Sequence, residues 1–360
     1  MSTKIKIQPT KRSRLGKVDF NNIPFGKETS DHMFVADYKN GKWRNPRIVP
    51  FGKFSINPTN LTLHYGQAFF EGMKAMRMTD GTPSFFRTDM SLERLNRSAE
   101  RMCMPQVPEE LFQSALHQLI EIDHEWLPNV PNSSLYIRPV MFATEEAYSV
   151  RPSKTYRFII FTGPVGPYYS KAVKLLADET FIRAAKGGTG EAKCAGNYAG
   201  SLYPAMLANQ KGYDQILWLD ANEHKYIQEV GTMNVMFVID GKVVTPMLDG
   251  SILRGITRDS IIEILKSKGY EIEERLISIY ELIEASKKGT LQEAFGVGTA
   301  AVVNLIAEIT YRDTKITIPP FKSDSISEIA RQYINKMRTG EISDEFGWVE
   351  KVEIGELVYN

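Results

Sequence analysis

One lysine of the chain has neighbours that suit it to covalent chemistry. Lys193 lies in the segment 187–198, GGTGEAKCAGNY, and a second segment, QEVGTMN, follows at 228–234. An amine attacks a carbonyl well only when it is partly desolvated and held in place, and nearby glycines let the backbone approach a bulky ligand. Most of the 44 Lys and Arg residues must be solvated surface charges. Lys193 is our candidate for the exception, a residue that forms a Schiff base.

Two glycine loops could bind a phosphate group. The segment GITRD at 255–259 leads into a predicted helix, and GVGTA spans 296–300. Both offer backbone amides and a hydroxyl to an anion, although an ordinary helix cap and a tight turn are the alternative for each. Neither is a Walker A motif. The glycines at 187–190 lack G-x-G-x-x-G and a preceding apolar strand, which argues against a nicotinamide enzyme.

Composition favours small-molecule chemistry. A length of 360 residues suits two domains, and 42% hydrophobic with 24% charged residues is typical of a soluble globular protein. The 44 basic residues nearly balance the 43 acidic ones, so no overall field would hold the chain on nucleic acid or anionic lipid. No run of about 18 apolar residues could span a bilayer. We expect neither nucleic-acid nor membrane partners.

Cysteine usage and the N-terminal segment indicate a cytoplasmic protein. Cys103 and Cys194 are far apart and form no CxxC, which argues against disulfides and a metal site and leaves both as small apolar residues. The first 30 residues lack the apolar stretch of a secretory signal. Six basic residues precede Asp19, as in organellar transit peptides, but Pro9 and the absence of a helical period favour a basic extended arm.

The first half of the chain has the pattern of an α+β domain. We predict strands over 134–142 and 155–162 and helices over 90–104 and 109–121. The segment GPVGPYY at 163–169 is dense in Pro and Gly and predicts the crossing between domains, with a boundary near residue 165.

The helix predicted over 90–104 carries two arginines beside its apolar stripe. Asp89 is placed to cap its amides and Pro105 to end it. Arg94 and Arg97 lie next to the stripe, which is formed by Leu92, Leu95, Ala99 and Met102.

The second half predicts three strands and three helices. Gly269 and Gly289 follow two of the helices as left-handed caps, Ser325 and Glu328 have capping-box spacing, and Pro204 interrupts a helical run after Tyr198. The predicted strands cover 215–219, 234–239 and 242–245, and the predicted helices cover 258–268, 279–288 and 326–337.

Eight short motifs follow one another along nearly the whole chain: SDHM (30–33), HYG (64–66) with FEGMK (70–74), YIRP (136–139), FIRA (181–184), the Lys193 segment, EVGTMN (229–234), GITR (255–258) and GTA (298–300). Together they resemble the class IV aminotransferases of pyridoxal phosphate fold type IV, and within them the branched-chain amino acid aminotransferases.

The resemblance implies pyridoxal 5′-phosphate as cofactor. Lys193 would bind it as a Schiff base and then move a proton between substrate Cα and cofactor C4′. Glu229 would face the pyridine nitrogen, since a protonated ring accepts the electrons; a surface carboxylate at a strand end is the alternative. Tyr198 would donate to the phenolic oxygen. The residues implied for the phosphate are Arg94, Arg183, Ile256, Thr257 and Thr299. For Arg94 the alternative is a surface salt bridge worth under about 1 kcal/mol.

The resemblance also implies a substrate pocket that accepts an aliphatic side chain and the carboxylate of glutamate. Its residues would be Phe70, Tyr65, Tyr136, Arg138, Tyr168, Thr232 and Ala300, with Thr232, Thr299 and Ala300 offering donors to the α-carboxylate. Aromatic residues also commonly belong to a core.

The implied fold has two domains, of α+β and α/β type, in a homodimer whose active sites borrow residues from the neighbouring subunit. A small α/β domain would cover 1–165, a crossing loop 166–178, and a larger pseudo-barrel α/β domain that binds the cofactor 179–360.

The implied activity is ping-pong transfer of the amino group of L-leucine, L-isoleucine or L-valine to 2-oxoglutarate. Its partners are thus small amino acids and 2-oxo acids, with no metal. A D-amino acid aminotransferase or an aminodeoxychorismate lyase of the same fold is the alternative, while Lys193 and Glu229 together argue against a cofactor-free binding protein. The redox CxxC that some animal members carry after the Thr-Ala pair is replaced by AVVN at 301–304. Arg254 has no explanation at this level.

Overall fold

The computed structural model describes residues 4–23, 25–166 and 171–355. They divide into two units. Unit 1 takes the described residues of Met1–Tyr168, Ala192–Ala195 and Lys336–Asn360, and unit 2 takes those of Tyr169–Glu191 and Gly196–Asn335.

The predicted domain ranges differ from these units in three places. The Lys193 segment joins unit 1 because its backbone bonds to that of Phe70, and the C-terminal segment joins unit 1 because it adds a strand to the unit 1 sheet. The predicted crossing loop, 166–178, contains a strand at Val173–Ala177, whose residues alternate between buried and more exposed positions with a period of two. Residues 167–170 of that loop lie outside the described residues.

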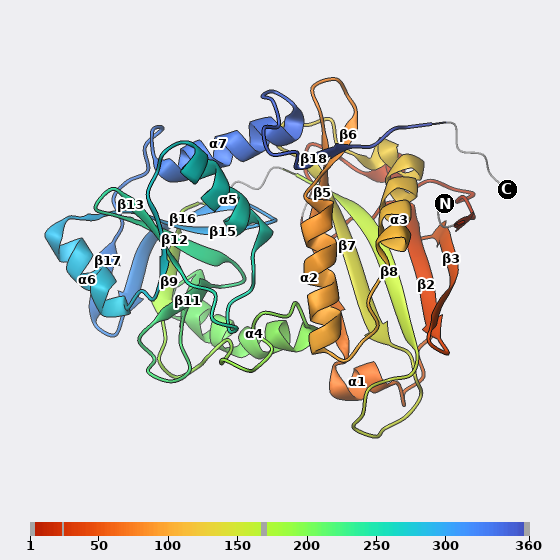
Figure 1. The fold of residues 1–360 in the computed structure, drawn as a ribbon, viewed down its shortest axis with the longest axis horizontal. Helices are drawn as coiled ribbons and strands as arrows, with labels where there is room; N and C mark the ends of the chain where they lie inside the picture. The colour runs from red at the N-terminus through yellow and green to blue at the C-terminus, as the bar shows by residue number, and fades with distance from the viewer. Residues whose placement is uncertain (1–3, 24, 167–170, 356–360) are drawn as a thin grey trace. The chain divides into compact units, whose positions relative to one another are not determined.

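Unit 1 is built on a nine-stranded sheet (Figure 1). Its order is β1-β3-β2-β8-β7-β5-β6-β18, and β4 pairs with β7. All pairings are antiparallel except that of β1 with β3. The strands are β1 (Lys6–Ile7), β2 (His32–Lys39), β3 (Lys42–Pro50), β4 (Ala68–Phe70), β5 (Met73–Arg77), β6 (Pro83–Phe86), β7 (Ser134–Ala143), β8 (Tyr156–Val165) and β18 (Val349–Lys351).

Two helices, α2 (Thr88–Arg101) and α3 (Glu109–Ile122), lie side by side on one face of this sheet (Figure 1). The stripe of Leu92, Leu95 and Ala99 is buried, as predicted. The predicted cap is wrong, because α2 begins at Thr88 after Arg87 and Asp89 falls in its first turn. Shorter helical pieces complete the unit: α1 (Leu61–Tyr65), η1 (Leu15–Lys17) and η2 (His124–Trp126).

The two faces of the sheet differ in character. Leu135 and Ile137 of β7 belong to the main core with α2 and α3. Successive side chains of a strand point to opposite faces, so Tyr136 and Arg138 lie on the other face, and both are only half-buried. Lys74 of β5 pairs with Tyr136 in register and therefore shares that face.

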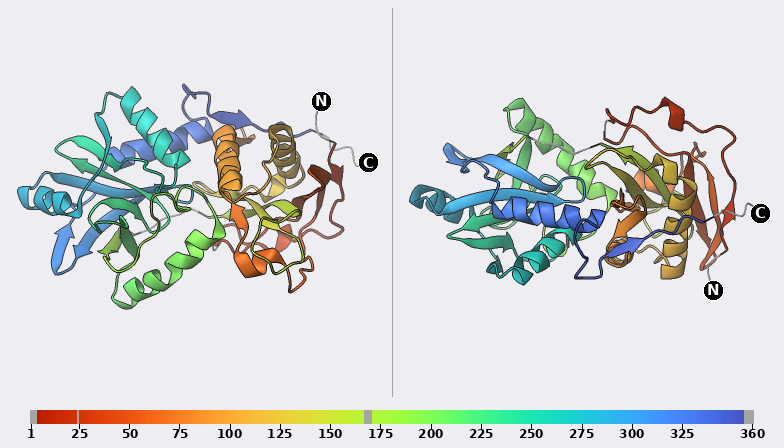
Figure 2. Two further views of the ribbon diagram at one scale, coloured as in Figure 1. Left: turned by 60° about the horizontal axis from the view of Figure 1, so that its bottom comes forward. Right: turned by 90° about the horizontal axis from the view of Figure 1, so that it is seen from above.

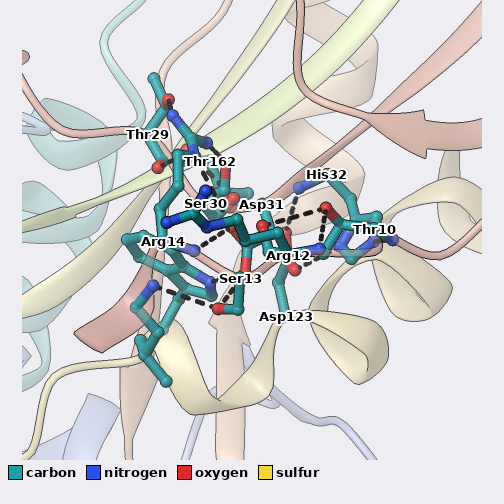
Figure 3. A network of polar contacts seen from close by, with 12 residues as sticks. Thr10, Arg12, Ser13, Arg14, Thr29, Ser30, Asp31, His32, Asp123 and Thr162 are labelled. Carbon is teal, nitrogen blue, oxygen red and sulfur yellow. Dashed lines mark hydrogen bonds and ion pairs between the residues drawn. The ribbon is translucent and has the colours of Figure 1, made fainter. Parts of the chain in front are cut away.

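The predicted N-terminal arm is anchored on β2 by a polar network (Figure 3). Asp31 accepts hydrogen bonds from the Ser13 hydroxyl (2.5 Å) and the Arg14 amide (2.9 Å). The Thr10 amide donates to His32 Nε2, so the ring proton is on Nδ1, which donates to Asp123. Asp31 and His32 of the SDHM motif thus hold the arm in place through hydrogen bonds.

Unit 2 is also built on a nine-stranded sheet, of mixed pairing. Its order is β11-β10-β9-β16-β15-β12-β13-β14, and β17 pairs with β16. The strands are β9 (Val173–Ala177), β10 (Gln215–Leu219), β11 (Ile227–Val230), β12 (Asn234–Ile239), β13 (Lys242–Pro246), β14 (Ile272–Arg275), β15 (Leu291–Gly298), β16 (Val302–Tyr311) and β17 (Thr314–Thr317). The strands predicted over 215–219 and 234–239 are confirmed to the residue.

Helices surround the unit 2 sheet (Figure 2): α4 (Ala195–Gln210), α5 (Ile256–Ser267), α6 (Ile279–Lys288) and α7 (Ile326–Thr339), whose last residues belong to unit 1. Gly269 and Gly289 have the predicted positive φ. The predicted capping box at Ser325 does not form. Glu293 of β15 instead accepts the amides of Ile326 and Ser327 and caps α7 from a strand distant in sequence. In the described part of the chain, no helix has the length and apolar character needed to cross a membrane.

Candidate active site

Lys193 is held by backbone hydrogen bonds inside unit 1. Its amide donates to the Ser98 hydroxyl of α2 (2.9 Å), and its carbonyl accepts the amide of Phe70 (3.1 Å). The next residue, Cys194, forms a β-bridge with Phe69. The Lys193 ammonium lies 5.0 Å from the centre of the Phe70 ring, so an apolar surface flanks it. Lys193 therefore has the fixed backbone and partial desolvation that an amine nucleophile requires.

A buried ion pair lies beside this segment. Arg94 of α2 donates from Nε and Nη2 to the two carboxylate oxygens of Glu71, both at 2.6 Å. Arg94 is 6% exposed and Glu71 fully buried. Burial by itself would raise the pKa of Glu71. The charges of Arg94 and Lys193, together with the hydrogen bonds from Arg94 and the Gly72 amide, outweigh this effect and lower the pKa of Glu71 below its ordinary value. Glu71 is thus a carboxylate that couples Arg94 to the Lys193 neighbourhood.

We expect the Glu71→Gln variant to lose about 3–5 kcal/mol of unfolding free energy near neutral pH, since it leaves a buried guanidinium without its counter-charge. The folded-state pKa of Glu71 lies below its ordinary value of 4.5, so its contribution is present above that pH and is lost as the pH falls through the folded value. Urea denaturation from pH 7 down to pH 3 measures this, and the wild-type and variant curves should converge in acid.

The matched control is Glu93→Gln, which removes the exposed partner of Arg97 on the same helix. Such a pair contributes about 0–1 kcal/mol. Equal losses of unfolding free energy in the two variants would show that the buried Glu71–Arg94 pair stabilises the fold no more than an exposed pair does.

The other sheet residues predicted to contact substrate cluster with Lys193. The Arg138 guanidinium stacks 4.5 Å from the centre of the Phe70 ring and donates from Nη2 to the Tyr136 hydroxyl (3.1 Å). A side chain on Gly72 would overlap that hydroxyl, so glycine is required where Tyr136 crosses the backbone. Cation, phenol and apolar ring thus lie together on one face.

Two further aromatic residues were predicted to line the pocket. Tyr65 ends α1 and is 42% exposed, so it belongs to the unit 1 surface. Tyr168 lies outside the described residues.

Unit 2 contributes a second charged pair. Glu229 of β11 is 3% exposed, and its Oε1 accepts the Leu253 amide at 2.7 Å. Arg183 lies 3.2 Å from the same oxygen and also donates to the carbonyls of Gly190 and Ser251. Glu229 is therefore a buried, oriented carboxylate and not a surface acid at a strand end. Arg183, predicted near a phosphate, pairs with Glu229 in this structure.

Gly190, three residues before Lys193 in the chain, belongs to unit 2 with this charged pair, and its carbonyl accepts a hydrogen bond from Arg183. Gly190 packs so closely that a side chain would overlap the Ser251 carbonyl and the Ala184 side chain. This contact fixes the backbone three residues before Lys193 on unit 2, while Ala192–Ala195 belongs to unit 1.

The segment GITR opens α5, as predicted for an anion loop. Within the described residues no side chain caps this helix, because its N-cap is Gly255. A side chain at Gly255 would overlap the Asn234 amide oxygen, and the Asn234 amide nitrogen holds the loop by donating to the Leu253 carbonyl at 2.9 Å. Ile256 and Thr257 occupy the first turn and are buried at 8% and 4% exposure. Uncapped first-turn amides at a helix N-terminus suit a phosphate group.

The remaining predicted residues lie on unit 2. Tyr198 is in the first turn of α4, Thr232 is exposed in the turn between β11 and β12, and Thr299 and Ala300 follow β15. Unit 1 gathers Lys193, Arg94, Phe70, Tyr136 and Arg138. Unit 2 pairs Arg183 with Glu229 and places Ile256 and Thr257 at the start of α5.

Sequence reasoning missed the role of Glu71 and Ser98. A usable signal existed, because Arg94 lies on the buried side of an amphipathic helix, where a guanidinium requires a buried acid. Glu71 is the single acid in the run 68–76, AFFEGMKAM. Arg254 also has a contact now, since its Nε lies 3.8 Å from Glu191 Oε2, but both side chains are about half exposed and the pair adds little.

Residues 68–309 match the family model described as Amino-transferase class IV. Over 353 residues the chain is 46% identical to "Branched-chain-amino-acid aminotransferase 2" of Bacillus subtilis (strain 168). The match covers 97% of this chain and 96% of that relative. The structure of the branched-chain amino acid aminotransferase from Escherichia coli has a TM-score of 0.72 and 27% identity, over 89% of this chain and 99% of that one. Another branched-chain amino acid aminotransferase, solved in complex with N-(5′-phosphopyridoxyl)-L-glutamate, has a TM-score of 0.71 and 27% identity, over 88% of this chain and 98% of that one.

Proposed function

The chain belongs to the class IV aminotransferases and, within them, to the branched-chain amino acid aminotransferase family, and we propose that it transfers the amino group of L-leucine, L-isoleucine and L-valine to 2-oxoglutarate. The products are the branched-chain 2-oxo acids and L-glutamate. The observation that carries this proposal is the placement of Lys193, whose backbone is bonded to Phe70 and Ser98 next to the Arg138–Tyr136 face.

Family membership implies pyridoxal 5′-phosphate as cofactor, and the described residues fit it. The uncapped start of α5, with Ile256 and Thr257, suits its phosphate, and Thr299, Arg94 and Arg183 would add hydroxyl and positive charge. Buried Glu229 suits a protonated ring nitrogen, and Tyr198 would donate to the phenolic oxygen. When bound, the cofactor supplies an aldehyde that condenses with amines and a ring that accepts electrons.

Lys193 and Glu229 then each have a defined task in the reaction. Lys193 would hold the cofactor through its amine, and as a free base the same amine would take up the proton that leaves substrate Cα. The negative charge of Glu229 holds a proton on the ring nitrogen. Amino donor and 2-oxo acid use the same site in turn, which gives ping-pong kinetics.

The face made by Phe70, Tyr136 and Arg138 suits both substrate types. The Phe70 ring offers apolar area to a branched side chain, and the Arg138 guanidinium stacked on it offers charge-assisted hydrogen bonds to the second carboxylate of glutamate. The family motifs add Tyr65, Tyr168, Thr232 and Ala300 to the proposed substrate-binding residues.

A direct assay tests this function. With 2-oxoglutarate as acceptor, the protein supplied with pyridoxal phosphate should form glutamate from L-leucine, L-isoleucine and L-valine. D-alanine should give no product, because removal of the Cα proton requires the base on one face of the substrate. Activity with D-alanine alone would assign the chain to a D-amino acid aminotransferase.

We propose that the working form is a homodimer. Large apolar side chains on α4 are exposed in the single chain, with Leu202 at 69%, Tyr203 at 57% and Met206 at 47%. A helix face of this kind suits a second copy of the chain. Sedimentation equilibrium should give twice the chain mass of 40.8 kDa, and a fully active monomer would refute the dimer.

A further inference from the structure

Unit 2 contains a cavity whose lining residues have no task in the proposed transamination. Its volume is about 190 Å³, and a cavity of about 150 Å³ is enough for a ligand the size of benzene. Strands β11 and β13 and the segments that follow β10, β13 and β14 contribute to its walls. The apolar part of the lining includes Ile227, Pro246, Met247, Ile252 and Leu276. The cavity can therefore hold a small organic molecule with an aliphatic part.

The charged part of the lining is mostly acidic. Asp220, Glu223 and Asp249 line the cavity together with one basic residue, Lys186. Burial by itself would raise the pKa of Asp220, but hydrogen bonds from four backbone amides of the turn 222–226 outweigh this effect and lower it below its ordinary value. Three carboxylates against one ammonium give the lining a net negative charge, which attracts a cation.

One buried acceptor in this lining has no donor. Gln228 is 4% exposed, and within the part of the chain that the structure describes its Oε1 has no hydrogen-bond partner. Its Nε2 donates to the Ser251 hydroxyl at 2.8 Å, and that hydroxyl donates to Asp249 Oδ1 at 2.6 Å. Because the hydroxyl has a single proton, it can only accept from Gln228, which fixes Oε1 as the unused end of the amide. A buried oxygen without a donor is costly, so an N–H group of a ligand would stabilise it.

We propose that this cavity binds a primary ammonium group carried on a short aliphatic chain. The ammonium donates to Gln228 Oε1 and to the Asp249 carboxylate. The aliphatic chain packs on Met247 and Leu276, which are 42% and 50% exposed in the structure. Two sources share this chemistry: a free alkylamine, and an aliphatic amino acid whose carboxylate binds Lys186. The site does not depend on the aminotransferase assignment, because all of its residues belong to unit 2.

Isothermal titration calorimetry of the full-length protein tests the site. The protein is saturated with pyridoxamine phosphate, which has no aldehyde that could condense with an amine. 3-Methylbutylammonium should bind, and methylammonium should bind more weakly, by about fourfold for each methylene group that the cavity buries. L-leucine in a parallel titration distinguishes the sources. Tighter binding of L-leucine that Lys186→Met abolishes identifies an amino acid, and any other order identifies a free amine.

Three variants assign the binding to this cavity. Asp249→Asn should weaken 3-methylbutylammonium by about 10- to 100-fold, because asparagine still accepts the Ser251 hydroxyl but lacks the charge. Leu276→Ser, at a half-exposed position, should weaken 3-methylbutylammonium and leave methylammonium unchanged. The control Asp313→Asn removes an exposed acid of unit 2 outside the cavity and should change neither affinity. No binding to the wild type, wild-type affinity in Asp249→Asn, or an equal loss in Asp313→Asn would overturn the proposal.

Discussion

Replacing Lys193 with alanine should abolish transamination, with a fall in kcat/KM of at least about 10⁴-fold. The variant loses both the amine that would bind the aldehyde and the base that would take up the Cα proton. The backbone contacts with Ser98 and Phe70 do not involve the side chain, so the fold should persist. Steady-state kinetics with L-leucine measure the loss of activity, and a circular dichroism spectrum checks that the fold persists.

The matched control is Lys186→Ala, which removes an exposed lysine from the residues that precede the same glycine-rich segment. Its activity should stay close to that of the wild type. If Lys193→Ala retained substantial activity, or if Lys186→Ala lost as much, the nucleophile would have been assigned to the wrong residue.

Replacing Glu229 with glutamine should lower kcat by about 10²–10³-fold, with a smaller effect on KM. Glutamine keeps the shape of the side chain and can still accept the Leu253 amide, but it lacks the negative charge that holds a proton on the ring nitrogen. The loss therefore falls on the step in which Cα releases its proton. Single-turnover kinetics with L-leucine isolate that step from product release.

Two variants calibrate this result. Glu229→Asp restores the charge at a shorter reach and should recover part of the loss. Glu223→Gln removes an exposed carboxylate of the same unit, whose ion pair with Lys225 spans 3.9 Å, and should have no effect. A Glu229→Gln enzyme with wild-type kcat would contradict the proposed task of Glu229.

The family and the fold class were predicted correctly from the sequence because the motifs are local. Segments such as FEGMK, YIRP and EVGTMN each place several residues at fixed spacing, and their order along the chain does not depend on tertiary detail. The helix predicted over 279–288 and the strands over 215–219 and 234–239 were also correct, since clear turn residues end each of them.

The errors concern contacts between residues distant in sequence. The start of α7 is capped by Glu293, 33 residues upstream of Ile326, so local spacing suggested the wrong partner. Unit 1 gains the C-terminal segment because β18 pairs with β6, a contact between residues more than 250 positions apart. Periodicity reports which side of an element is apolar, but not which distant element covers it.

The candidate site shows the same limit. The motifs identified Lys193, Arg94 and Glu229 as residues to examine, but they did not reveal that Glu71 binds Arg94 or that Arg183 binds Glu229. Both are charge pairs formed on burial, and their partners lie 23 and 46 residues apart in sequence. The Lys193→Ala and Glu229→Gln variants test the roles of these two residues toward the cofactor.

The most direct test is the visible absorption spectrum of the purified protein loaded with pyridoxal phosphate, recorded before and after addition of L-leucine, with D-alanine in a parallel sample. We expect a band of lysine-bound cofactor that L-leucine removes, that 2-oxoglutarate then restores, and that D-alanine leaves unchanged. A band that responds only to D-alanine, or no band after pyridoxal phosphate is supplied, would contradict it.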